Sequence, residues 1–280
     1  MANLRAFIVG STGETGKALI KALAKDTRYS SIKLIQRRKT DVDYGFENKD
    51  SENRFTQIII DFDHLDDYQE VFQDTDVGFC ALGTTLKKSG KEKMRIIDHD
   101  YVIHIAKLSS AAGCKEFHLV SSKLLLNTST SDIGLLTANK TSYLFLVNDR
   151  TSLNIGRQAA NKTSIFFYLQ LKGETESDLI SLNLFPKCLA IYRPATLLCS
   201  RVESRLAERA FQNLLKPFAY LAPTLLTTPI DILAKAMANA PFSSKLKTDL
   251  SVQQEKSLPK NVYIFENSDI FLLASDNKDI

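Results

Sequence analysis

Tyr168 and Lys172 are the two residues of this chain whose types and spacing best support proton chemistry. The stretch around them predicts a helix, and a spacing of four residues places both side chains on one helical face, about a turn apart. An ammonium close to a phenol favours the phenolate and lowers the phenol pKa from about 10 toward neutrality, which makes the tyrosine a usable acid or base. Two unrelated surface residues of a helix often share this spacing, so the pair needs support from the rest of the chain.

That support comes from a glycine turn near the amino terminus. Residues 4–9 predict a buried strand, residues 18–24 predict a helix, and between them Gly10-Ser-Thr-Gly-Glu-Thr-Gly16 has the spacing G-x-x-G-x-x-G. Gly10 allows the tight turn, Gly13 the close approach of a pyrophosphate, and Gly16 the packing of helix on strand, with free amides at the helix start facing the phosphates. Glycine turns also occur without a ligand, but a strand before and a helix after favour a dinucleotide site.

The residues after the second predicted strand indicate which dinucleotide binds. Residues 32–36 predict that strand, and Arg37, Arg38 and Lys39 follow it. In dinucleotide-binding folds this strand end lies beside the adenosine ribose, where an acid accepts from a free 2′-hydroxyl and arginine meets a 2′-phosphate. No acid stands here, which favours NADP(H). The alternative is three solvated cations on a loop.

Further strands and helices alternate along the chain and place more polar groups at one edge of a sheet. The strand predicted over 76–82 ends in Leu82-Gly83, where backbone can approach a ligand, and the strand over 116–120 ends in Ser121 and Ser122. A serine there can hold a substrate oxygen for Tyr168 to protonate, although strand-end serines are more often turn residues. The sequence thus predicts an α/β fold with a doubly wound parallel sheet, that is, an NAD(P)-binding Rossmann fold. Its other predicted strands cover 57–62, 187–193 and 262–265, and its other helices cover 65–72, 96–112 and 229–237.

Taken together, these motifs resemble those of the atypical short-chain dehydrogenase/reductases, in the Tat-interacting-protein oxidoreductase family. The resemblance covers most of the chain except about residues 124–164 and the far carboxyl end. Its motifs are Gly10-Ser-Thr-Gly-Glu-Thr-Gly16, Leu34-Ile-Gln-Arg-Arg-Lys39, Asp76-Val-Gly-Phe-Cys-Ala-Leu-Gly-Thr-Thr85, Asp98-His-Asp-Tyr-Val102, Ser121-Ser-Lys123, Tyr168-Leu-Gln-Leu-Lys-Gly-Glu174, and Arg193-Pro194 through Glu203-Ser-Arg205.

The resemblance implies a role for each matching position. Tyr168 is the expected proton donor or acceptor, Lys172 is expected to hold the cofactor ribose and tune the tyrosine, and Ser122 is preferred to Ser121 because the wider superfamily usually uses the second serine of such a pair. The remaining expected cofactor contacts are the phosphate turn (Thr12, Gly13, Glu14, Thr15), the 2′-phosphate site (Arg37, Arg38), the nicotinamide ribose site (Leu82, Gly83) and the cover over the cofactor (Leu197, Arg205).

The segment between Ser122 and Tyr168 is longer than the family pattern and contains an internal repeat. About residues 127–148 are duplicated as about residues 149–170: Ile133-Gly134, Ala138-Asn-Lys-Thr-Ser142 and Phe145 return as Ile155-Gly156, Ala160-Asn-Lys-Thr-Ser164 and Phe167, at a constant offset of 22. The first copy has Leu146 and Arg150 where the second has Tyr168 and Lys172, so only the second copy supplies the acid/base pair. We expect a surface excursion that acts as a lid or a contact surface.

Composition bounds the remaining possibilities. The chain has 280 residues, 44% hydrophobic residues and a formal net charge of +4 that is spread along the sequence, so it predicts one globular domain over 1–280 and no nucleic-acid partner. About residues 124–164 form the inserted segment of that domain, and about 195–280 its substrate or lid region. No apolar run reaches membrane-spanning length, so no membrane span is predicted. The four cysteines lack paired spacing, which predicts reduced thiols and a cytoplasmic location. The resemblance adds the nuclear envelope or the nucleus as expected locations. The histidines lack metal-ligand spacing, so no metal site is predicted.

Two functions of different classes follow. The first is an NADPH-dependent oxidoreductase acting on a small carbonyl or alcohol, with Tyr168 moving the proton, Ser122 orienting the oxygen and Lys172 setting the tyrosine pKa. The second is an NADPH-binding regulator that acts through protein partners, for example in nuclear transport, transcription or apoptosis, as the family resemblance implies.

Overall fold

A parallel sheet of seven strands forms the centre of the molecule. The computed structural model describes residues 3–41, 46, 49–122, 167–198, 227–243 and 258–275. Within them the strand order is β3-β2-β1-β4-β5-β6-β9, and every neighbouring pair is parallel. The strands are β1 (Leu4–Val9), β2 (Tyr29–Gln36), β3 (Phe55–Ile59), β4 (Val77–Cys80), β5 (Glu116–Val120), β6 (Cys188–Tyr192) and β9 (Val262–Phe265). The predicted doubly wound Rossmann architecture is therefore confirmed.

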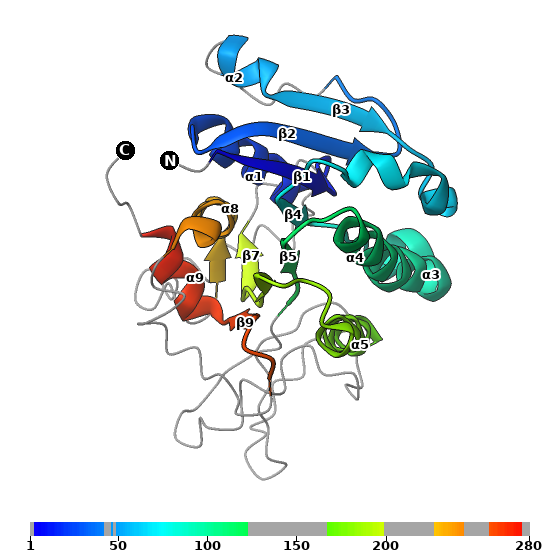
Figure 1. The fold of residues 1–280 in the computed structure, drawn as a ribbon. Helices are drawn as coiled ribbons and strands as arrows, with labels where there is room; N and C mark the ends of the chain where they lie inside the picture. The colour runs from blue at the N-terminus through cyan, green and yellow to red at the C-terminus, as the bar shows by residue number, and fades with distance from the viewer. Residues whose placement is uncertain are drawn as a thin grey trace.

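Helices cover both faces of this sheet, as Figure 1 shows. One face packs against α1 (Glu14–Lys25), α8 (Ile230–Asn239) and α9 (Asn267–Ala274). The other packs against the 3-10 segment η1 (Phe62–Phe72), α4 (Tyr101–Ala111) and α5 (Phe167–Leu182). Because both faces are covered, the central strands read as continuous apolar runs: residues 6–9 of β1 are fully buried.

The chain reverses its winding direction between β1 and β4, and this reversal determines where a ligand can bind. From β1 the chain moves outward to β2 and β3, and it then returns to β4 on the other side of β1. In sheets of this kind, ligands bind outside the carboxyl ends of the strands at such a switch point. The turn after β1, the loop after β4 and the two serines after β5 all lie at this edge.

Several local features differ from the sequence-based expectation. Two helices were not expected from the sequence: α2 (Lys49–Asn53) and α3 (Leu86–Arg95). The helix expected over 96–112 opens with a π-helical turn, η2 (Ile96–Asp100), before α4 begins. A second, two-stranded parallel sheet joins β7 (Thr196–Leu198) to β8 (Thr227–Pro229); a final 3-10 turn, η5, covers Ala240–Phe242.

Some predictions concern residues outside the described ranges. These are the duplicated segment, apart from its last residues 167–170, and the cofactor contact expected at Arg205. Within the described part of the chain, none of the helices combines the length and apolar character that crossing a bilayer demands. Cys80, Cys114 and Cys188 are free and buried, as expected for reduced thiols; Cys199 lies outside the described residues.

Candidate active site

The turn between β1 and α1 has the shape of an anion cradle. Gly10 adopts a φ of +85°, and a Cβ on it would lie 2.4 Å from the carbonyl oxygen of Ala81. A Cβ on Gly16 would lie 2.2 Å from the carbonyl oxygen of Gly10, so only glycine lets α1 start this close to the strand. Gly13 is the N-cap of α1, no side chain caps the helix there, and Thr12, Gly13 and Glu14 are exposed. The first amides of α1 thus remain available to a phosphate.

Arg37 and Arg38 directly follow β2 and are both exposed. Neither forms an ion pair with another described residue. Gln36, the last residue of β2, is buried, and its side chain accepts from Ser11 Oγ at 3.1 Å and donates to Gln57 Oε1 at 2.6 Å. The strand end therefore presents an amide and two guanidinium groups where NAD-binding folds present an acid.

A pocket of about 480 Å³ opens at the switch point and brings the candidate groups together. Its wall contains residues 13–15 of the phosphate turn and residues 81–86 of the loop after β4. The wall also contains Ser121, Tyr168, Lys172 and Leu197. A pocket lined at one end by helix amides and at the other by a phenol and an ammonium suits a dinucleotide that spans both.

Lys172 lines this pocket and pairs with an acid, Asp98, that belongs to a sequence motif but had been given no role. Its ammonium is 2.9 Å from Asp98 Oδ1 and 5.8 Å from the centroid of the Tyr168 ring. Lys172 is 3% exposed and Asp98 is fully buried, whereas Tyr168 is 37% exposed. The ion pair lies beneath the tyrosine, which is open to the pocket.

Asp98 also connects the helix that carries Tyr168 to the loop after β4. Its Oδ2 accepts a hydrogen bond from the Thr84 amide at 2.9 Å. A Cβ on Gly83 would lie 3.4 Å from Asp98 Oδ1, so this loop passes directly over the carboxylate. Because Asp98 lies in the π-helical turn η2, the unusual helix geometry coincides with the polar centre of the site, as is frequent for π-turns.

Opposing effects act on the charge of Lys172. Burial by itself lowers the pKa of the ammonium, but the Asp98 carboxylate, and after it Tyr168, more than offset this, so that the pKa is raised above its ordinary value. Lys172 is therefore a cation at every physiological pH.

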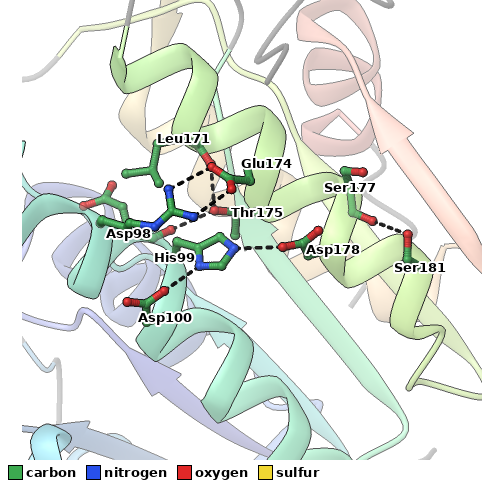
Figure 2. A network of polar contacts seen from close by, with 10 residues as sticks. Asp98, His99, Asp100, Leu171, Glu174, Thr175, Ser177, Asp178 and Ser181 are labelled. Carbon is green, nitrogen blue, oxygen red and sulfur yellow. Dashed lines mark hydrogen bonds and ion pairs between the residues drawn. The ribbon is translucent and has the colours of Figure 1, made fainter. Parts of the chain in front are cut away.

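The outer side of α5 is fastened to the neighbouring helices by a row of polar contacts, shown in Figure 2. Arg95 donates to both carboxylate oxygens of Glu174 at 3.0 and 2.7 Å, and the Thr175 hydroxyl donates to the Asp98 carbonyl at 3.1 Å. His99 lies between two carboxylates, with Nε2 2.9 Å from Asp178 and Nδ1 2.7 Å from Asp100. These contacts fix the helical position from which Tyr168 and Lys172 project.

The two strand-end serines have different surroundings. Ser121 lines the pocket, and its hydroxyl donates to the buried carboxylate of Glu176 in a short hydrogen bond. Glu176 in turn pairs with Arg193 at 2.6 Å. Ser122 has a buried Oγ with no hydrogen-bond partner among the described residues. Ser121 thus supports α5 from the pocket wall, whereas Ser122, the serine preferred from the sequence, has an uncommitted hydroxyl but is not among the described residues that line the pocket.

The other predicted contact residues are placed as follows. Thr15, Leu82 and Gly83 line the same pocket as Tyr168, and Leu197 lies on its far side in β7. Arg205 lies outside the described residues. The residue that sequence reasoning missed is Asp98, which shares a buried helical face with Val102, Ile105 and Ser109. Because a buried acid requires a cationic partner, the position of Asp98 in this apolar pattern could have indicated from the sequence that it forms an ion pair.

A larger hollow, of about 900 Å³, lies elsewhere, beside the starts of β1 and β2. The Arg54 guanidinium on its wall donates to the backbone carbonyls of Ala24, Asp26 and Tyr29, so three of its five N–H groups are engaged in fixing the local fold. Its position at the amino ends of the strands, away from the switch point, makes it a poor candidate for the active site.

Comparisons with known proteins place the chain in a nucleotide-binding family. The family model described as NAD(P)H-binding matches residues 10–155. Protein HTATIP2 of Rattus norvegicus is 35% identical over 243 residues, which cover 85% of this chain and 81% of that protein. The mitochondrial protein FMP52 of Debaryomyces hansenii is 28% identical over 251 residues, covering 86% of this chain and 90% of that protein.

A solved structure extends the comparison to the fold. The UDP-N-acetylglucosamine 4-epimerase of Methanobrevibacter ruminantium, in complex with UDP-N-acetylmuramic acid, superposes with a TM-score of 0.57 at 15% identity. The match covers 87% of this chain and 74% of that chain. At this identity the likeness concerns the Rossmann fold alone.

Proposed function

This chain belongs to the atypical short-chain dehydrogenase/reductases that include HTATIP2, with an NAD(P)H-binding domain, and from that premise we propose that it is an NADPH-dependent oxidoreductase. It interconverts a small carbonyl compound and the corresponding alcohol. The observation that carries the proposal is the buried Asp98–Lys172 ion pair beneath the exposed Tyr168, on the wall of a pocket that reaches the phosphate turn.

The residues present fit a nicotinamide dinucleotide. Without side chains on Gly10 and Gly16, α1 starts beside the strand with its amides uncapped, which is a cradle for the pyrophosphate. Thr12 to Thr15 would hold this part, and Arg37 and Arg38 would hold a 2′-phosphate as charge-assisted donors. The absence of an acid at the end of β2 supports NADPH over NADH.

The chain's own groups would divide the remaining work. When bound, NADPH supplies the hydride. Tyr168 exchanges the proton with the substrate oxygen from its exposed position on the pocket wall. Lys172 forms an ion pair with Asp98 and has three N–H donors, which would also hold ribose hydroxyls beside Leu82 and Gly83. Ser122 would orient the substrate oxygen once its buried, uncommitted hydroxyl turns into the pocket, and Leu197 and Arg205 would cover the cofactor.

The proposal is tested by following NADPH oxidation against a panel of aldehydes, ketones and quinones, with Tyr168→Phe measured in parallel. Turnover that depends on Tyr168 supports the oxidoreductase. Cofactor binding without Tyr168-dependent turnover of any panel member would instead support an NADPH-binding regulator acting through protein partners.

We further propose that residues 1–280 form one domain, with about 124–164 as an insertion and about 195–280 as the substrate or lid region, in a cytoplasmic protein. The yeast relatives carry mitochondrial names. Fractionation of the cells that make this protein tests the location: recovery in the cytoplasmic fraction supports the proposal, and recovery with mitochondria contradicts it. A single cooperative thermal transition supports the one-domain assignment.

A further inference from the structure

Three buried side chains that could bind a metal lie close together near the amino ends of β5 and β6, at the edge of the sheet opposite the active site. Glu116 and His118 belong to β5, and Cys188 is the first residue of β6. One ligand atom from each lies within 4.8 Å of the others. We propose that Glu116, His118 and Cys188 bind a single Zn²⁺ ion that joins β5 to β6.

The sheet itself determines this juxtaposition. Residues two apart on a strand point to the same face, so Glu116 and His118 share one. The parallel register places Cys188 beside Glu116 and Ala190 beside His118. Because both strands are central and covered on both faces, the three donors are held by backbone pairing more rigidly than loop residues would be.

The imidazole of His118 has one nitrogen committed and one available. His118 is fully buried, and Nδ1 lies 2.9 Å from the hydroxyl of Tyr192. Nε2 has no hydrogen-bond partner among the described residues and lies 3.7 Å from Glu116 Oε2. Metal-binding histidines commonly use the second nitrogen in this way, with a hydrogen bond that fixes the tautomer and leaves the other nitrogen for the metal. The orphaned Nε2 therefore points to a missing ligand.

The donor set selects zinc by its chemistry. One thiolate, one imidazole and one carboxylate match the sulfur, nitrogen and oxygen donors that Zn²⁺ accepts at about 2.0–2.3 Å. Binding exchanges the Cys188 thiol proton, which leaves to solvent, for the Zn–S bond, with no change of oxidation state. The two negative ligands balance the charge of the ion, which lowers the free-energy cost of burying it.

Lys187 competes with the ion for Glu116. Its ammonium lies 2.5 Å from Glu116 Oε1, and its side chain is 56% exposed, so it can turn into solvent and release that oxygen. The second carboxylate oxygen then completes a four-coordinate site. Because Lys187 competes with the ion for Glu116, replacing Lys187 with an uncharged residue should increase the affinity for zinc.

The position of the cluster indicates a structural ion. Glu116 begins β5, whereas Ser121, on the pocket wall, follows its other end. The ion would therefore stabilise the strand pair without touching the cofactor, and nothing in its binding depends on the proposed oxidoreductase activity.

The test uses the full chain, refolded with and without Co²⁺ as a spectroscopic substitute for Zn²⁺. We expect a thiolate-to-cobalt absorption band, visible bands of tetrahedral intensity, and about one bound zinc per chain by mass spectrometry after refolding with Zn²⁺ and dialysis. Cys188→Ser should abolish the thiolate band, and His118→Asn should weaken zinc binding. Lys187→Gln should strengthen it.

The matched control is Cys114→Ser, a buried cysteine whose sulfur donates to the Glu116 carbonyl at 3.3 Å but lies outside the donor group. It should keep the band. Should the Cys188 variant fail to fold, X-ray absorption of the wild-type zinc protein decides, with one sulfur neighbour expected. The proposal is overturned if the refolded wild type shows no thiolate band and no retained zinc, or if the band survives Cys188→Ser.

Discussion

The ammonium of Lys172 lies 2.9 Å from the Asp98 carboxylate, and both groups are almost completely buried. Asp98 also accepts from the Thr84 amide, so a single acid joins the helix that carries Tyr168 to the loop that borders the pocket. The position of Tyr168, the proposed proton-transfer residue, therefore depends on the buried Asp98–Lys172 ion pair as well as on its own helix.

Asp98→Asn should destabilise the protein by about 3–5 kcal/mol, because it leaves the Lys172 charge buried without its partner. Urea unfolding measures this. Asp100→Asn is the matched control, since Asp100 is an exposed acid of the same helical turn that contacts His99; it should cost less than about 1 kcal/mol. Equal losses in the two variants would contradict the assigned role of Asp98.

The same variant should change the pH dependence of stability. Burial lowers the pKa of Lys172, but Asp98 raises it above the ordinary value of 10.5. A raised folded-state pKa contributes stability that is fully present below the unfolded pKa and is lost only as pH rises through the folded value. Wild-type unfolding free energy should thus keep this contribution from pH 7 to about pH 10, whereas the Asn variant should lose stability on acidification from pH 10 because its lysine must be charged while buried.

Tyr168→Phe should reduce kcat by about 10²–10⁴-fold while NADPH affinity changes little, because the proton donor is lost and the phosphate and ribose contacts remain. Stopped-flow turnover and calorimetric binding on one preparation separate the two effects. Loss of binding together with turnover would show that the phenol supports the cofactor instead.

Arg37→Gln combined with Arg38→Gln should weaken NADPH binding by about 10–100-fold, as expected for losing charged hydrogen bonds worth about 1.5–3 kcal/mol. NADH affinity should stay the same, because NADH lacks the 2′-phosphate. Lys39→Gln, a charge change one residue further along, is the control. An equal loss for both dinucleotides would place the arginines outside the 2′-phosphate site.

Two glycine variants should separate packing from cofactor contact. A Cβ on Gly16 would lie 2.2 Å from the Gly10 carbonyl oxygen, so Gly16→Ala should lower stability by about 1–3 kcal/mol. A Cβ on Gly13 would lie 3.4 Å from the same atom, so Gly13→Ala should fold normally yet lose NADPH affinity, because it fills the space meant for phosphate. Thermal melts with and without NADPH report both quantities.

Much of the fold was readable from the sequence because buried parallel strands are continuous apolar runs. Leu4–Val9 and Glu116–Val120 begin and end where the sequence predicts. The α3 helix was missed because its apolar content is low and Gly90 interrupts it with a φ of +73°. The β7 and β8 strands were missed because each has only three residues, too few for an alternating pattern.

The candidate site was readable where its residues are close in sequence. The spacing of Tyr168 and Lys172 and that of the glycines are local patterns. Asp98 reaches Lys172 only through tertiary packing, and Cys188 meets Glu116 only through strand register, so neither partnership has a local signature. Ser121 and Ser122 are adjacent in sequence, and only the structure distinguishes their surroundings: Ser121 lines the pocket and contacts Glu176, whereas the Ser122 hydroxyl has no hydrogen-bond partner among the described residues.

Calorimetric titration of the purified 280-residue chain with NADPH and with NADH tests the central claim most directly. The account predicts a single site that binds NADPH with micromolar or better affinity, binds NADH more weakly, and loses affinity for both in Lys172→Met, since that variant removes the proposed ribose contact. Absence of binding by both dinucleotides to the folded wild-type protein would contradict it.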